Sequence, residues 1–254
     1  LRSKGTNPHL LVMTATPIPR SLALTLYGDL DISIMDEMPA GRIPINTFVL
    51  RPQERERAFT LLRGQIKDDK QAFIIYPLIE ESDKIEARAA VDDYETLSKE
   101  VFPDLKLGLL HGKMRPAEKD ETMLKFRDKQ YNILVSTTVV EVGVDVPNAT
   151  VMVIEGADRF GLAQLHQLRG RVGRGADQSY CLLIPTREDA TENERLQIMA
   201  ESNDGFVLAE KDLQIRGPGE FLGTRQAGFA SSLGMASITD VKLIDNARTQ
   251  AHAV

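Results

Sequence analysis

The sequence predicts an α/β protein built on a doubly wound parallel sheet. Short apolar runs recur along the chain, and stretches with helical spacing separate them. Several of these runs are apolar throughout, which is typical of parallel strands buried on both faces. Strands that alternate with helices form βαβ units. The predicted strands are 10–13, 45–50, 72–77, 106–112, 132–138, 150–157 and 179–186.

Helical spacing fills most of the intervals between these strands. Residues 54–69 repeat apolar side chains every three to four positions, which is the pattern of a helix with one buried face. The segment 115–129 places Pro116 in its first turn and acids after it, as helix N-termini prefer. Another helix ends within "QLHQLRGRVGRG" (164–175). The remaining predicted helices are 86–101, 191–202, 204–215 and 238–253.

Composition limits the class of protein. No apolar run reaches the roughly 18 residues of a membrane helix, and the start of the sequence shows no signal peptide. The single cysteine, Cys181, lies in an apolar run and is expected to be a small buried side chain. We therefore expect a cytoplasmic protein. The net charge of −6 argues against a nucleic-acid partner unless the basic side chains are clustered.

Such a cluster occurs at 164–175, where three arginines alternate with three glycines. Because like charges at this spacing repel, we expect an anion opposite them, and the glycines suggest that it approaches the backbone. The guanidinium fork suits phosphate oxygens. An arginine that reaches the γ-phosphate raises the rate of phosphoryl transfer about 10³–10⁵-fold. A solvated basic turn is the alternative. The residues are Arg169, Gly170, Arg171, Gly173, Arg174 and Gly175.

A second polar motif is "STTVVEVGVDVPNAT" (136–150). Glu141, Gly143 and Asp145 alternate with valines after a strand. Polar groups beyond the carboxyl end of a parallel strand occupy the usual ligand crevice of an open sheet, so we expect these three residues there. A strand-edge turn with solvated carboxylates fits the pattern equally well.

A third motif is "LLHGKMRPAEKD" (109–120), in which His111 ends a strand. Lys113 and Arg115 then open a helix, and a helix N-terminus beside cations can hold a phosphate. A packed histidine in a βα loop is the alternative, and it is favoured if the motif is taken alone.

The fourth motif, "MTATPIPR" (13–20), places Thr14 and Thr16 after a strand. Their hydroxyls could relay between a nucleotide and a nucleic-acid groove. Capping of the following helix is an equally good interpretation.

In their order, these motifs resemble those of a superfamily 2 helicase motor. "TAT" (14–16) is similar to motif III, "STTVVEVGVDVP" (136–147) to motif V, and "QLRGRVGR" (167–174) to the Q-x-x-G-R-x-G-R of motif VI. Residues 13–47 and "LAEKDLQIRGPGEFLGTRQAG" (208–228) further resemble RecG-type DNA translocases.

The resemblance implies a domain organisation. Residues 1–28 would be the tail of a first motor domain, and 29–187 a second, RecA-like motor domain. Residues 188–254 would form a translocation motif with a helical hairpin, a loop and a C-terminal helix.

The resemblance also implies site residues. Arg171 and Arg174 would be catalytic, with Gln167 ordering them, and Gly143, Asp145 and Glu141 would lie with them at the ATP. Residues that couple ATP hydrolysis to movement on DNA would be Thr14, Thr16, His111, Arg216, Arg225 and Gln226.

The implied function is ATP-dependent translocation on double-stranded DNA, which remodels stalled replication forks and Holliday junctions in repair and recombination. The sequence contains no G-x-x-x-x-G-K-[ST] phosphate loop and no convincing acidic Mg²⁺ motif. We therefore expect a fragment that is inactive alone and whose Mg²⁺ ligands lie elsewhere. Expected partners are branched DNA, a first motor domain and wedge domain of the same polypeptide, and single-stranded-DNA-binding protein, at the bacterial nucleoid.

Three alternatives remain open. A transcription-repair coupling factor shares the translocation motif, although residues 27–42 look more like RecG proteins. An RNA helicase of the same superfamily has no need for the loop in 208–228. A non-catalytic binding module could keep the sheet without the motor.

Overall fold

The computed structural model describes residues 41–77, 91–137 and 145–216, together with Leu11, Ser33, Met35 and Gln250. The three continuous stretches belong to one compact unit, Ile32–Arg216. The strand predicted at 10–13, the helix predicted at 238–253 and the domain boundary predicted after residue 28 lie outside the described residues.

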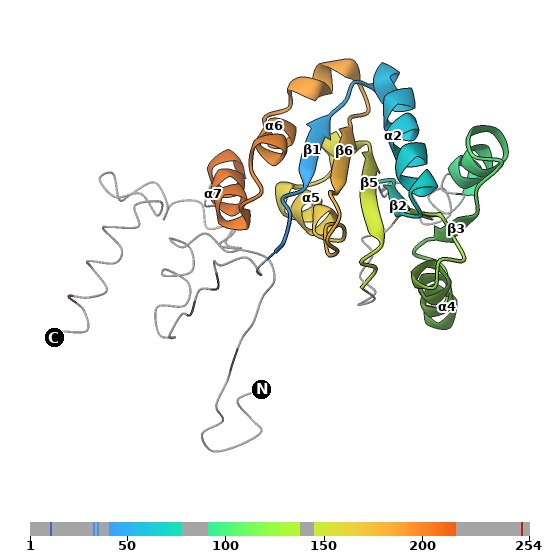
Figure 1. The fold of residues 1–254 in the computed structure, drawn as a ribbon. Coiled ribbons are helices and arrows are strands. Elements are labelled where there is room, and N and C mark those ends of the chain that lie inside the picture. Colours follow the sequence, from blue (N-terminus) through green and yellow to red (C-terminus); the bar gives the residue numbers. More distant parts are fainter. Residues whose placement is uncertain are drawn as a thin grey trace. The chain divides into compact units, whose positions relative to one another are not determined.

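Six parallel strands form the sheet in the order β1-β6-β5-β2-β4-β3 (Figure 1). Each of them overlaps a segment predicted to be a strand, and β2 and β5 begin one residue earlier than predicted, so the strands are confirmed for the described part of the chain. The strands are β1 (Asn46–Val49), β2 (Gln71–Ile75), β3 (Leu107–Leu110), β4 (Ile133–Ser136), β5 (Ala149–Glu155) and β6 (Tyr180–Ile184).

The order of the strands confirms the doubly wound topology. The chain enters at edge strand β1, continues at β2 inside the sheet and moves outward to β3 at the other edge. It then returns through β4 and passes to β5 and β6 on the far side of β2. Because all strands run the same way, their starts line one edge of the sheet and their ends line the opposite edge. We call these the amino edge and the carboxyl edge.

Most predicted helices are present. The segment predicted at 191–202 is divided, because Asn193 ends a short helical turn and caps the next helix by accepting the Arg195 N–H at 3.0 Å. The segment predicted at 86–101 is described from residue 91 and is helical to residue 101. The helices are α2 (Arg55–Lys67), α4 (Pro116–Arg127), α5 (Leu162–Arg169), α6 (Glu194–Glu201) and α7 (Gly205–Arg216), with short helical turns η2 (Pro52–Glu54), η3 (Leu97–Val101), η4 (Ala157–Arg159) and η5 (Glu188–Glu192).

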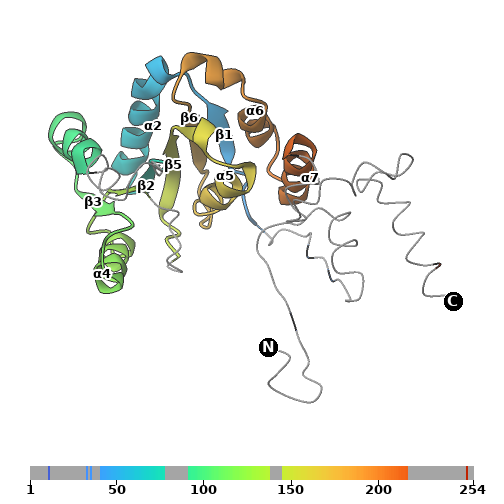
Figure 2. The ribbon, with the colours of Figure 1, turned by 180° about the vertical axis from the view of Figure 1, so that it is seen from behind.

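The helices cover both faces of the sheet. On one face α2 and η3 pack against alternate strand residues such as Ile74. On the other face α4, α5, α6 and α7 pack against the intervening positions, such as Phe73 and Ile75. Figures 1 and 2 show α6 and α7 toward the β1 edge and α4 toward the β3 edge. The two helices of the predicted hairpin thus share the core of the sheet, and the domain boundary at residue 188 remains a prediction.

Aromatic and sulfur side chains fill the centre of this core. The rings of Phe73 and Phe126 meet edge to face, with centroids 4.9 Å apart. Cys181, the second residue of β6, has 0% exposure, as predicted, and burial raises the pKa of its thiol to about 12. Within the described residues, no helix has the length and apolar character needed to span a membrane.

Truncating Phe126 tests the α4 side of the core. We expect Phe126→Ala to lower the free energy of unfolding by about 3–5 kcal/mol, because a buried ring is lost and a cavity remains. The matched control is Leu124→Ala on the same helix, where the side chain is 42% exposed. Urea denaturation of both variants checks this, and equal losses for the two would contradict the described packing.

Candidate functional site

The loop between α5 and β6 contains Arg171 and Arg174 of the predicted arginine cluster (164–175), and it has a defined backbone. The Gly170 N–H donates to the His166 carbonyl at 3.0 Å and closes α5. The Arg171 N–H donates to the Leu168 carbonyl at 3.0 Å and continues the turn. Because the loop leads into the start of β6, it lies at the amino edge of the sheet.

Two of the glycines serve the packing of this loop. Gly173 has φ +72°, and a Cβ there would lie 2.8 Å from Cγ1 of Ile45. A Cβ on Gly175 would lie 2.8 Å from the Pro147 carbonyl oxygen. The expectation that the glycines admit an outside group is therefore wrong for these two positions, because the chain's own Ile45 and Pro147 occupy that space.

The three arginines have different environments. Arg169 is only 2% exposed and points into the core. Its Nη1 donates to the carbonyls of Met199 and Ser202, both at 2.8 Å, and approaches Oγ1 of Thr47 at 3.4 Å. Its Nη2 lies 3.2 Å from Nδ1 of His166. The expectation of an anion opposite Arg169 is wrong, because neutral oxygens at the end of α6 bind it.

These bonds explain how a cation is tolerated in the core. A hydrogen bond from a charged group contributes about 1.5–3 kcal/mol, so two good ones are comparable with the penalty of several kcal/mol for burying the charge. The partial negative charge at the C-terminus of α6 adds to them. Burial, followed by the charges of Arg169 and Arg42, lowers the pKa of His166 to about 4. His166 is therefore neutral near pH 7, and its Nδ1 can accept from Arg169.

Arg174 faces outward. Its side chain is 38% exposed, and its Nη1 lies 3.2 Å from Oδ1 of Asp145, which is 55% exposed. Its Nε donates to the Gly170 carbonyl at 3.1 Å. An ion pair this exposed contributes at most about 1 kcal/mol, so a stronger anion could displace the carboxylate.

Asp145 lies at the amino edge, since β5 begins four residues later. The expectation that it occupies the carboxyl-edge crevice is therefore wrong. The physical reason is that the chain leaves β4 at the carboxyl edge and has to return to the amino edge before it can start another parallel strand. Glu141 and Gly143, in the same motif, lie outside the described residues.

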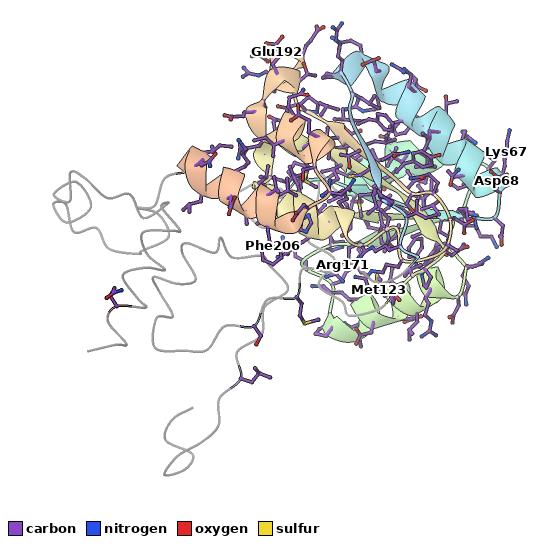
Figure 3. All side chains as sticks on the ribbon, turned by 60° about the vertical axis from the view of Figure 1, so that its left-hand side comes forward. Lys67, Asp68, Met123, Arg171, Glu192 and Phe206 are labelled. Atoms are coloured by element: carbon purple, nitrogen blue, oxygen red, sulfur yellow. The ribbon has the colours of Figure 1, made fainter. Side chains whose placement is uncertain are left out.

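Arg171 and Gln167 complete the described part of this site. Arg171 is half-buried and Gln167 is exposed. They are four residues apart, so the last turn of α5 brings Gln167 to the same side as the start of the arginine loop. Arg171 is labelled in Figure 3. The structure thus brings Arg171, Arg174, Gln167 and Asp145 together around one loop at the amino edge.

His111 lies at the opposite, carboxyl edge, directly after β3. Its Nδ1 is buried and has no hydrogen-bond partner within the described residues. Burial, with Lys119 and Lys113 nearby, lowers the pKa of its ring. At the N-terminus of α4, Arg115 pairs with Glu118 at 2.6 Å, so a carboxylate already covers part of the predicted phosphate site.

Sequence reasoning missed a polar cluster at the carboxyl edge. Glu155, at the end of β5, is buried and accepts two bonds from Arg55, at 2.7 and 2.8 Å. Burial, then the charge of Glu155, raises the pKa of both Tyr76 and Asp93. The sequence signal for this pair is Glu155 itself, a single acidic residue at the end of the apolar run of β5.

The remaining predicted site residues lie at the end of α7 or outside the described part of the chain. Arg216 is the last residue of α7. Thr14, Thr16, Arg225 and Gln226 lie outside the described residues.

The pKa of His166 predicts a pH dependence of stability. Below about pH 6.5 the unfolded chain protonates this ring, whereas the folded chain does not until about pH 4. Its contribution to stability is therefore complete above pH 6.5 and is lost as the pH falls through that window. His166→Asn keeps an acceptor for Arg169 and cannot titrate. Urea denaturation at pH 7.5 and 4.5 should show a smaller loss in the variant, and equal losses would contradict the low pKa.

Comparisons with known proteins agree along the whole chain. Residues 54–176 match the family described as helicase conserved C-terminal domain, and residues 202–254 match ATP-dependent DNA helicase RecG, domain 3, C-terminal. Curated proteins named ATP-dependent DNA helicase RecG from Synechocystis sp., Bacillus subtilis and Thermotoga maritima are 52%, 51% and 50% identical to it, over 100%, 99% and 100% of this chain. The alignments cover 31%, 37% and 33% of those proteins, so the chain spans about a third of their length.

A solved structure gives the same result for the fold. The structure of RecG bound to a three-way DNA junction matches 92% of this chain, and 30% of its own length, with a TM-score of 0.71 and 47% sequence identity. The predicted α/β fold with a parallel sheet is confirmed. Half of all positions are identical along the full chain and the fold is shared, and the chain therefore belongs to the RecG family.

Proposed function

We propose that this chain is the second motor domain and translocation motif of an ATP-dependent enzyme that remodels branched double-stranded DNA. The observation that carries the proposal is the loop at the amino edge, whose backbone is fixed and whose Arg174 forms an ion pair with an exposed carboxylate. The names of the relatives support ATP and DNA as substrates. The solved relative bound to a three-way junction supports branched DNA, as in stalled forks and Holliday junctions.

Arg174 is proposed as the residue that contacts the terminal phosphate of ATP. A phosphate accepts two guanidinium bonds and carries more charge than Asp145, so it would displace the exposed carboxylate. A guanidinium that contacts the transferring phosphoryl group stabilises the charge that develops in the transition state. Asp145 would hold Arg174 within reach until then.

The neighbouring residues have supporting roles in this proposal. Arg171, on the same loop, would contact a second phosphate oxygen, and Gln167 on α5 would orient it. Glu141 and Gly143, together with Asp145, would line the nucleotide, as their place in motif V implies.

The described residues fit the phosphates of a nucleotide better than they fit a metal ion. Two guanidinium groups lie at one loop, whereas no group of three His, Cys, Asp or Glu side chains within the described part of the chain could hold a metal. We propose that Mg²⁺ is bound with ATP by residues of a first motor domain, which would also supply the phosphate loop. Mg²⁺ would neutralise phosphate charge.

The DNA is proposed to contact the carboxyl edge and the translocation motif. His111 lies at the carboxyl edge, and the length of the strands separates it from the arginine loop at the amino edge. Arg216 ends α7, and Arg225 and Gln226 follow it in the sequence. Thr14 and Thr16 would connect the nucleotide with the DNA, as motif III implies.

The full protein is proposed to contain a first motor domain and a wedge domain that contacts the junction. Single-stranded-DNA-binding protein is a further proposed partner. The reported relatives are bacterial, which supports a place at the nucleoid in the cytoplasm.

The comparisons favour this proposal over its alternatives. The C-terminal 53 residues match a family described specifically for RecG, and the curated relatives carry that name. None of the three curated relatives reported above is named as a transcription-repair coupling factor or an RNA helicase. Movement of the branch point of forked DNA with ATP and without RNA polymerase would distinguish the proposed enzyme from a coupling factor. The same result would distinguish it from a non-catalytic binding module.

The variant Arg174→Ala tests whether Arg174 contacts the terminal phosphate of ATP. In the full-length protein we expect this variant to lose at least about 10³-fold in ATP turnover, because it lacks the charge that stabilises the transition state. Steady-state phosphate release with forked DNA measures it. The matched control is Arg127→Ala at the end of α4, which pairs with the adjacent Asp128.

Turnover of Arg174→Ala within a few-fold of the parent would remove the role assigned to Arg174. If the parent neither hydrolyses ATP nor moves the branch point of forked DNA, the proposed function itself fails.

A further inference from the structure

Arg169 connects the arginine loop with the joint between α6 and α7. It is the last residue of α5, and its guanidinium binds the carbonyls of Met199 and Ser202 at 2.8 Å. Among the described residues, its hydrogen-bond partners are all neutral. A buried arginine without a carboxylate partner is uncommon, because burying a charge is costly unless its donors are fully used.

The partner atoms belong to the end of a helix. The last carbonyls of any α-helix have no intrahelical partner and carry partial negative charge. At α6 the Ser202 N–H still bonds to the Ile198 carbonyl, and the chain then leaves the helix in an extended conformation. Asp204 begins the next helix by accepting the Phe206 N–H at 2.8 Å. One guanidinium therefore fixes the point at which α6 ends and α7 is about to begin.

The same residue forms the base of the arginine loop. Arg169 precedes Arg171 by two residues and Arg174 by five, and its carbonyl accepts the Val172 N–H at 3.2 Å. Val172 is fully buried, and Gly173 packs against Ile45. Side chain and backbone of Arg169 are thus both held, the side chain by the end of α6 and the backbone by the turn that begins the loop.

We propose that Arg169 is a positioning residue, which sets the reach of Arg171 and Arg174 by tying their loop to the joint between α6 and α7. Arg169 does not contact the nucleotide. This inference rests on the proposed function for its effect on turnover, but the contact itself is independent of that function.

The shape of the guanidinium is part of the argument. Its Nη1 uses its protons on two carbonyls while Nη2 faces His166, so the plane of the group has one direction. A lysine at this position would keep the charge and reach a carbonyl, but it would lack the fork that fixes the direction. A methionine would fill the space and leave the carbonyls without their donor.

The test compares Arg169→Met, Arg169→Lys and the control Arg127→Met in the full-length protein. Two quantities are measured, namely kcat and KM for ATP with forked DNA, and amide hydrogen exchange without nucleotide. For Arg169→Met we expect kcat to fall on the order of 10–100-fold, because a misplaced catalytic group costs about this much. KM should stay within about threefold of the parent, since uniform binding is not removed.

Exchange should become faster at 170–175 and at 199–204 in Arg169→Met, while β5 keeps the exchange rate of the parent. Arg169→Lys should have a kcat between those of Arg169→Met and the parent, because the charge at the end of α6 returns but the fork that fixes its direction does not. Arg127→Met should match the parent in both measurements.

Several outcomes would overturn the inference. One is Arg169→Met with the kcat and exchange of the parent, and another is faster exchange throughout β5 as well, which would indicate a general loss of stability. If Arg169→Met does not fold, Arg169→Lys decides: a modest loss of kcat at constant KM with faster exchange at 170–175 supports the inference, and parent values overturn it. Failure of both variants to fold also overturns it, because Arg169 would then support the whole fold.

A failure of the proposed function is distinguishable from these results. It would appear as a parent protein without ATP turnover on forked DNA. The exchange comparison at 170–175 and 199–204 needs no turnover and would still test the contact made by Arg169.

Discussion

The burial of the parallel sheet on both faces is the constraint on which the other features depend. All seven residues of β5 are buried, and helices cover each face. Polar groups that act on a ligand therefore have to lie at the two edges, where strands begin or end. Strands of four to seven residues separate these edges by roughly 13–23 Å. The arginine loop lies at one edge and His111 with the Arg55–Glu155 pair at the other, so the two groups of polar residues are separated by the length of the strands.

The amino edge shows how closely packing and charge are combined. Gly173 and Gly175 have to be small because Ile45 and Pro147 lie against them, and Arg169 is held by the end of α6. Because the backbone is fixed in this way, the side chains of Arg171 and Arg174 start from defined positions although they are partly exposed. Rigidly placed, partly exposed cations suit phosphate recognition, because little conformational entropy is lost when the anion binds.

The sequence predicted the described strands and most of the helices, since apolar runs and helical spacing report burial directly. It also grouped Arg174 with Asp145, and these two side chains form an ion pair in the structure. Their surroundings were less predictable. Charge and spacing treat Arg169 and Arg174 alike, whereas only the packed α6 makes Arg169 internal. Asp145 was assigned to the wrong edge because the pattern does not reveal where a chain turns back. The Arg55–Glu155 pair joins residues 100 positions apart, which no local pattern can indicate.

The position of Cys181 has a practical consequence. It is the single cysteine of the sequence, it is fully buried in β6, and its thiol stays protonated well above neutral pH. Since the thiolate is the reactive form, maleimide dyes would leave it unmodified in the folded protein. Pairs of cysteines introduced on the surface could then be labelled without removing the native thiol. Fluorescence energy transfer between such dyes would report distances within individual molecules of this chain in solution.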